Sequence, residues 1–236
     1  MTRVSWITLT LSVVLTSPVF AAGIDMTWDN CAADGGTSDI VFDCATYGGT
    51  AQLFGSWISD VEIQQFHTLE LIIDLQADAP DLPPFWDFFP GCNWQVLLDT
   101  DSFDPVCASY RRPWGQYPPG GWEIPLAYYP HFGGVANRGR FVGTIYRTIR
   151  TAILADRPYF AFILQIWNDF QCEGCTTPVV LVFNQATLLS DTLPPVVITN
   201  PGQLSNCATT SGGGGVPCGA TPATHKTWGA LKTLYR

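Results

Sequence analysis

Charged residues are scarce in this 236-residue sequence: only 13% are Asp, Glu, Lys or Arg, while 47% are hydrophobic. This balance excludes a disordered chain, which combines few apolar residues with many like charges. Basic residues are the scarcest, with 11 Lys and Arg against 20 Asp and Glu and a net charge of −9. A surface that binds nucleic acid is basic, so we expect no nucleic-acid partner.

Motifs for common catalytic and metal sites are also missing. There is no Gly-x-Ser-x-Gly, HExxH or HxH motif, and the three histidines (His67, His131 and His225) are expected in loops or at the surface. Asp99, Asp101 and Asp104 lie close together but lack the glycine and the further oxygen ligands of an EF-hand loop. We therefore expect no metal and no cofactor.

Glutamate is rare, with four residues in the chain. A glycosidase needs two carboxyl groups about 5–9.5 Å apart. Glu70 and Asp74 share one face of an expected strand, where four residues separate them by about 13 Å. No catalytic residue is therefore predicted. A glycoside hydrolase or lyase that takes its carboxylates from different strands stays open as the alternative function.

Long hydrophobic runs are confined to the N-terminus. No charged residue occurs between Arg3 and Asp25, and the strongly apolar part, residues 4–15, is shorter than the roughly 20 residues that span a membrane. Residues 19–21 have the small-residue pattern of a cleavage site. We predict a signal peptide over residues 1–21, no transmembrane segment in the mature chain, and a secreted protein located outside the cell or in the periplasm.

All eight cysteines follow this segment: Cys31, Cys44, Cys92, Cys107, Cys172, Cys175, Cys207 and Cys218. An even number in an exported chain indicates disulfides. The cysteines form four local couples, so we predict nearest-neighbour pairing: Cys31–Cys44, Cys92–Cys107, Cys172–Cys175 and Cys207–Cys218. The Cys172–Cys175 motif would need a second such pair to bind zinc, and a following helix to act as a redox centre; the sequence provides neither.

No stretch of the mature domain ahead of the tail has the 3.6-residue apolar period of an amphipathic helix. Apolar residues alternate with others at 69–76 and 140–145, and residues 159–167 are apolar on both faces, as in a central strand. Further strands are expected at residues 39–42, 52–58, 94–98, 179–189 and 196–199. Short strands separated by turn residues predict an all-β fold, a two-layer antiparallel β-sandwich of jelly-roll or immunoglobulin-like type.

Two regions differ from these strands in composition. Ten prolines and thirteen aromatic residues lie between residues 80 and 132, which predicts long, stiff loops. Near the C-terminus, the glycines at 212–215 indicate a flexible linker, and the tail beyond them holds both lysines of the chain. We expect the sandwich domain over residues 22–200, and a Gly-rich linker with a short basic tail over residues 201–236.

The aromatic loops provide the candidate ligand-binding residues, namely Trp86, Trp114, Tyr117, Trp122, Tyr128 and Tyr129. Stiff loops that present flat rings at one end of a sandwich are typical of carbohydrate-binding modules. The alternative is that the rings cover the edge of the core. The expected function is a secreted binding or structural module whose partner is a glycan or a cell-surface component.

Five stretches occur together: Trp28-Asp29-Asn30-Cys31, Asp74-Leu75-Gln76 with Leu82-Pro83, Gly133-Gly134-Val135-Ala136-Asn137-Arg138, Cys172-Glu173-Gly174-Cys175, and the ending Thr227-Trp228-Gly229-Ala230-Leu231-Lys232-Thr233-Leu234-Tyr235-Arg236. In these features the chain resembles a group of exported bacterial hypothetical proteins of about this length. The resemblance covers most of the mature chain. It implies a secreted bacterial protein and assigns no activity to any residue.

Overall fold

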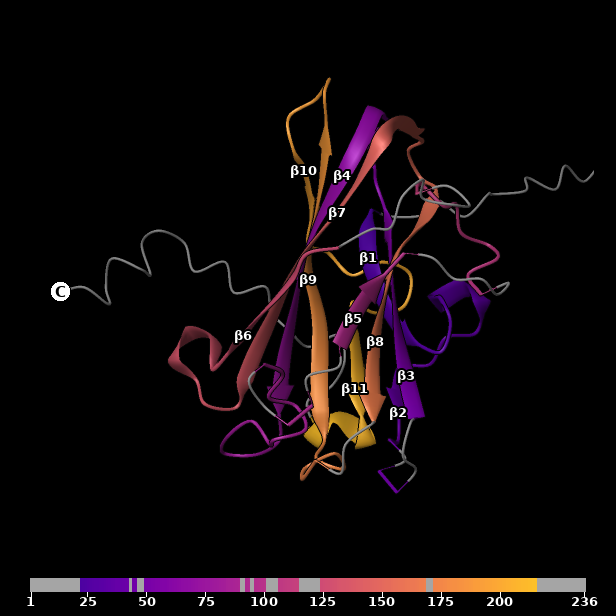
Figure 1. Cartoon of the computed structure of the whole chain (residues 1–236). Helices are drawn as coiled ribbons and strands as arrows, with labels where there is room; N and C mark the ends of the chain where they lie inside the picture. Colours follow the sequence, from indigo (N-terminus) through magenta and orange to yellow (C-terminus); the bar gives the residue numbers. More distant parts are fainter. Residues whose placement is uncertain are drawn as a thin grey trace, which may run out of the picture.

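The computed structural model describes residues 22–42, 44–45, 49–89, 92–93, 96–100, 106–114, 124–168 and 172–215. Two β-sheets pack face to face over a shared core (Figure 1), which confirms the predicted all-β sandwich. Within these residues there is no α-helix, and none of the described segments is a helix able to cross a membrane. All strand pairs described are antiparallel except the pair β2–β11.

The smaller sheet has four strands in the order β1 (Gly23–Trp28), β3 (Gly49–Ile58), β8 (Pro158–Asn168) and β5 (Val96–Asp99). β8 is buried on both faces along most of its length, as its sequence predicted. β5 pairs only with residues 163–166 of β8. Residues 111–114 continue beyond β5 along the same edge, where Arg111 exchanges backbone hydrogen bonds with Pro158 and Phe160.

The larger sheet has the order β2 (Asp39–Ile40), β11 (Cys207–Thr210), β9 (Val179–Ser190), β4 (Ile63–Ala77), β7 (Arg138–Ile153) and β6 (Leu126–Pro130). β10 (Val196–Ile198) pairs with the C-terminal half of β9. Three short 3-10 helices complete the elements: η1 (Ala32–Asp34), η2 (Phe132–Gly134) and η3 (Ser211–Gly215). Figure 1 shows β4, β7 and β10 reaching the upper end of the molecule.

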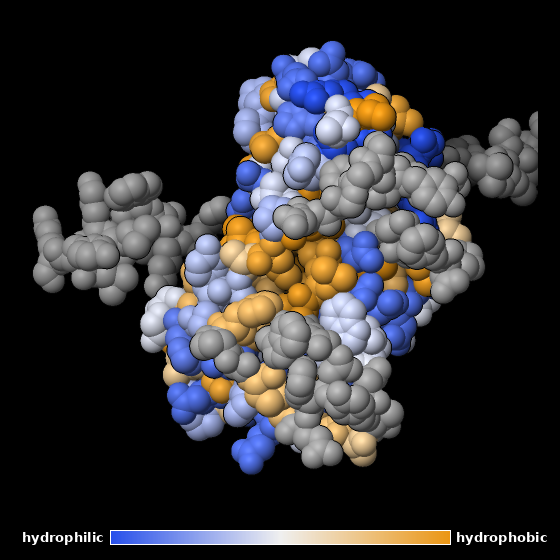
Figure 2. Space-filling model, viewed as in Figure 1, coloured by the Kyte–Doolittle hydropathy of each residue, from blue (hydrophilic) through white to orange (hydrophobic). Residues whose placement is uncertain are grey.

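Alternation along β4 defines the core side of the larger sheet. Leu69, Leu71, Ile73 and Leu75 are at most 1% exposed and face the smaller sheet, so the residues between them face outward. In the space-filling view, apolar residues also gather in the middle of the visible side, around β5 and β9, while the upper end is mostly polar (Figure 2). The larger sheet thus turns one apolar side to the core, while its other side carries polar residues together with some apolar ones.

The domain boundary predicted at residue 200 is too early. β11 lies inside the larger sheet between β2 and β9, and η3 packs against β9. Val180 and Val182, on the outward side of β9, are buried together with Cys207. The four-residue strand and the glycines after it are therefore part of the domain; their composition alone resembles a linker because glycine-rich segments carry no apolar pattern.

The predicted disulfide pairing is wrong for three of the four couples. The bonds are Cys31–Cys107, Cys44–Cys175 and Cys92–Cys172, with sequence separations of 76, 131 and 80 residues. Each bond joins loops that are distant in sequence and adjacent in space. Cys31, for example, immediately precedes η1 and lies beside residues 107–110, where the Asn30 side chain accepts a hydrogen bond from the Cys107 amide at 2.8 Å.

Cys207 is also disulfide-bonded, and its predicted partner, Cys218, lies outside the described residues. Cys172 and Cys175 each bond to a different loop, so the motif is not a redox pair in this structure. Disulfides of this kind persist in an oxidising compartment, which indicates an extracellular or periplasmic environment.

Asp25 is a buried carboxylate in the middle of β1. It is 3% exposed and accepts three backbone hydrogen bonds, from Gln203, Leu204 and Ser205, at 2.8–3.0 Å. Burial raises the pKa of the Asp25 carboxyl, and the three amides oppose that shift. The side chain therefore fastens the segment before β11 to the edge of β1.

We expect Asp25→Asn to lower the free energy of unfolding by about 1–3 kcal/mol, because the NH2 group that replaces one carboxylate oxygen cannot accept a hydrogen bond and would face a backbone N–H donor. Urea unfolding measures this loss, and Asp60→Asn, at an exposed loop position, is the matched control. Equal stabilities for the two variants would contradict the anchoring role.

Candidate functional site

The outer face of the larger sheet presents an ordered set of side chains, most of them polar. Four rows run across β4 and β7: Gln76 beside Arg138, Asp74 beside Arg140, Ile72 beside Val142, and Glu70 beside Thr144. Successive rows are two residues, about 7 Å, apart along the strands. We call this surface, together with the neighbouring outward residues of β6 and β9, the outer face.

Arg140 is the centre of a fixed network on the outer face. Its Nη2 donates to Asp74 Oδ2 at 2.7 Å and its Nε donates to Oδ1, so the pair is bidentate. Asn184 of β9 donates a further hydrogen bond to Asp74 Oδ2. The Arg140 guanidinium also lies 3.6 Å from the centre of the Phe132 ring in η2. These contacts hold a charged and an amide group in fixed positions across three strands.

Two exposed tyrosines lie on the same side of the sheet as these rows. Tyr129 of β6 lies beside Arg140, and Tyr146 lies on β7, three rows further along. Each is 51% exposed. Because the neighbouring residues Tyr128 and Ile145 contact the core, alternation directs Tyr129 and Tyr146 outward. The two rings are about 20 Å apart along the strands.

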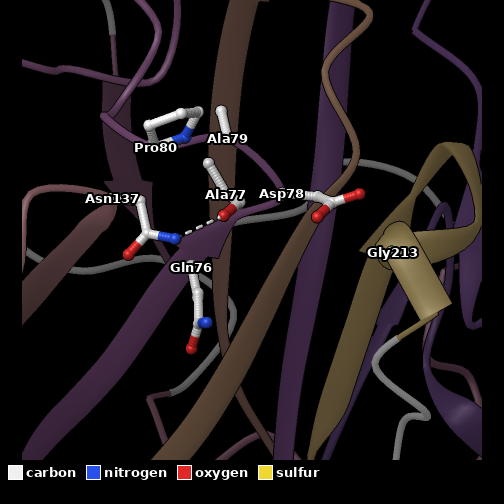
Figure 3. Close-up of a pocket in the computed structure, with 7 residues that line it drawn as sticks. All are labelled: Gln76, Ala77, Asp78, Ala79, Pro80, Asn137 and Gly213. Atoms are coloured by element: carbon white, nitrogen blue, oxygen red, sulfur yellow. Dashed lines mark hydrogen bonds between the residues drawn. The ribbon is translucent and has the colours of Figure 1, made fainter.

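An open pocket of about 340 Å³ lies where β4 ends, next to Gln76 of the outer face (Figure 3). It is lined by Gln76, Ala77, Asp78, Ala79, Pro80, Asn137 and Gly213. The Asn137 amide donates to the Ala77 carbonyl, while the side chains of Gln76, Asp78 and Asn137 point in different directions. The polar groups do not converge on a single reacting atom, so the pocket has the character of a polar recess and not of a catalytic centre.

The structure separates the aromatic residues that were predicted to bind ligand. Trp86 and Trp114 are core residues, 0% and 4% exposed, so neither ring has a face on which a sugar could stack in this conformation. Trp86 packs edge-to-face on Phe42 and Phe85, and Trp114 donates from Nε1 to the Ala161 carbonyl at 2.8 Å. For these two rings the alternative interpretation, closure of the core, describes the structure.

The tyrosines of the predicted set differ from each other. Tyr128 is partly buried and donates its hydroxyl to the Trp86 carbonyl at 2.9 Å; burial raises the pKa of this hydroxyl. Its neighbour Tyr129 is on the open surface. Tyr117 and Trp122 lie outside the described residues. The predicted site therefore contributes Tyr129 to the outer face, and Arg140, Asp74 and Asn184 join it from strands.

The two carboxylates on one face of β4 are not brought together as a catalytic pair. Glu70 and Asp74 lie two rows apart on the outer face, and both Asp74 oxygens accept hydrogen bonds from Arg140 or Asn184. In this part of the chain, no group of three or more His, Cys, Asp or Glu side chains could hold a metal ion. His67 is on β4, and its Nε2 lies 3.4 Å from Asp191 Oδ1. Asp191 also pairs with Arg150.

One signal for the outer face was present in the sequence. Asp74 and Arg140 both occupy polar positions of alternating strands, but their contact depends on the register between β4 and β7.

No protein-family model matches this chain, and no curated protein is significantly similar to it. The chemistry of the outer face is therefore the basis for assigning a function.

Proposed function

We propose that this protein is an exported binding module that holds a polysaccharide on its outer face. The observation that carries this proposal is the placement of an exposed ring, Tyr129, directly beside the fixed network of Arg140, Asp74 and Asn184. Sugar rings stack on flat aromatic side chains, and their hydroxyls exchange hydrogen bonds with carboxylate, guanidinium and amide groups. Because the network is held in place before a ligand arrives, little side-chain entropy is lost on binding.

The compartment supports the proposal. A sandwich with three long-range disulfides suits an oxidising environment outside the cytoplasm, where polysaccharides are exposed. The sequence adds the expected signal peptide over residues 1–21. A binding module needs only rings and hydroxyl partners, both of which the outer face contains.

Tyr129→Ala is expected to weaken polysaccharide binding by about 1–2 kcal/mol, or roughly 5–30-fold, because it removes the stacking surface. The melting temperature should change little, since an exposed ring contributes little to folding. Affinity gels or calorimetry with a panel of polysaccharides measure binding. Tyr129→Phe keeps the ring and is the first control; Leu204→Ala, an exposed apolar position in the turn beside β1, is the second.

The same panel tests the alternative of a hydrolase or lyase. Release of reducing ends or of unsaturated sugars by the mature protein would replace a binding module with an enzyme. If the natural protein binds a polysaccharide and Tyr129→Ala binds it with the same affinity, the binding site does not lie on the outer face.

A further inference from the structure

The shape of the outer face carries information about the ligand beyond its being a sugar. Tyr129 and Tyr146 lie on the same side of the sheet, about 20 Å apart, along the direction of β7. Val142 and Thr144 separate them on β7, and Ile72 and Glu70 lie beside these on β4. A ligand that contacts both rings must be extended and several sugar units long, and it must follow the strands.

The pocket at the end of β4 does not suggest recognition of a chain end. It is open, and its side chains point in different directions (Figure 3). A terminal sugar is normally held by polar groups that converge around it. The recess beside Gln76 is better suited to a chain that passes over the sheet than to one that stops there.

Charge on the outer face is balanced. The rows of β4 and β7 carry two arginines, Arg138 and Arg140, and two carboxylates, Glu70 and Asp74, and the Arg140 charge is already neutralised by its bidentate pair with Asp74. The whole chain carries a net charge of −9, which repels a polyanion at a distance. A uronic-acid or sulfated polymer would meet this repulsion without a surplus of basic side chains to offset it.

On these grounds we infer that the ligand is a neutral, linear polysaccharide that lies lengthwise along β4 and β7, with Tyr129 under one part of the chain and Tyr146 under another. This inference rests on the proposed function and specifies its ligand class. It assigns Tyr146 a binding role that its sequence position did not suggest.

The test uses the mature protein and neutral oligosaccharides of increasing length, from two to about eight units, with alginate, polygalacturonate and heparin as acidic probes. Affinity should rise with length until a chain reaches both rings. For the longest oligosaccharide, Tyr129→Ala and Tyr146→Ala should each weaken binding about 5–10-fold. For a disaccharide, which cannot reach both rings, only one of the two variants should have an effect. Added salt should leave these affinities unchanged, because no net charge is neutralised.

A second measurement does not depend on whether the Tyr146 variant folds. Hydrogen exchange in the unsubstituted protein should show that the longest oligosaccharide protects amides at both ends of the outer face, near residues 140 and 146. Tyr146→Phe, which keeps the ring, should bind as the natural chain does.

The outcomes separate the two proposals. Binding that is complete at two units, or restricted to acidic and salt-sensitive polymers, would overturn the inference and leave a polysaccharide-binding function standing. Protection confined to one end of the outer face would also overturn the inference. If none of the neutral or acidic polymers binds the natural chain, the proposed function itself is wrong.

Discussion

Replacing both cysteines of the Cys44–Cys175 disulfide with alanine should lower the free energy of unfolding by about 2–5 kcal/mol. This bond joins residues 131 positions apart, the largest separation among the three described disulfides. A cross-link reduces the conformational entropy of the unfolded chain, and this effect increases with the length of the closed loop. Because a domain of this size is stable by only about 5–15 kcal/mol, the loss should be visible as a large shift in the urea midpoint.

The control for this prediction is the pairing itself. Peptide mapping without reduction should recover Cys31–Cys107, Cys44–Cys175 and Cys92–Cys172 from the natural protein. Peptides that link Cys31 to Cys44, or Cys172 to Cys175, would contradict the structure. A double alanine variant as stable as the natural chain would show that the bond is dispensable.

Trp114→Ala should cost about 3–5 kcal/mol of stability, as expected for removal of a large buried ring. The ring is 4% exposed, lies 5.4 Å from the Phe66 ring on the opposite sheet, and hydrogen-bonds to the edge of β8 beyond the end of β5. Its removal would leave a cavity between the sheets and an uncovered Ala161 carbonyl. Thermal unfolding followed by circular dichroism measures the loss.

Tyr129→Ala is the matched comparison, because it also removes an aromatic ring but at the surface. It should change stability by no more than about 0.5 kcal/mol. The reverse order, with a stable Trp114 variant that no longer binds polysaccharide, would make Trp114 a ligand-binding residue, contrary to its burial in the structure.

The long strands could be predicted because their side chains follow a simple pattern. β4 alternates cleanly, and β8 is apolar on both faces, so each was recognisable from residues 69–76 and 159–167. β1 was not, because Asp25 and Thr27 interrupt its apolar residues although both are buried. Their hydrogen-bond partners include the Asn30 carbonyl and the amides of residues 203–205, which no local pattern could reveal. β6 and β11 are short and lie in segments rich in proline and glycine.

The disulfide pairing and the contacts on the outer face could not be predicted from the sequence, for a related reason. Eight cysteines allow 105 pairings, and local spacing favoured the wrong ones. The contact between Asp74 and Arg140 joins two strands that were each predicted correctly, but it requires their register. The pairing of β4 with both neighbours shifts between Ile63 and Thr68, and on β9 an extra residue, Asn184, lies opposite the step from Ile72 to Ile73. Tertiary pairing, and not local propensity, decides which polar residues meet.

During synthesis the chain emerges from its N-terminus, and this order conflicts with the order in which its cysteines must pair. When the first ninety or so residues are available, the only cysteines present are Cys31 and Cys44, and the structure bonds each of them to a later partner. A bond between these two is therefore non-native and has to be exchanged before the sandwich can close. The larger sheet also waits for the end of the domain, since β2 and the N-terminal half of β9 are joined only when residues 207–210 arrive to pair with both. Thiol–disulfide exchange late in folding is thus a requirement of this topology whenever an early oxidant reaches the chain.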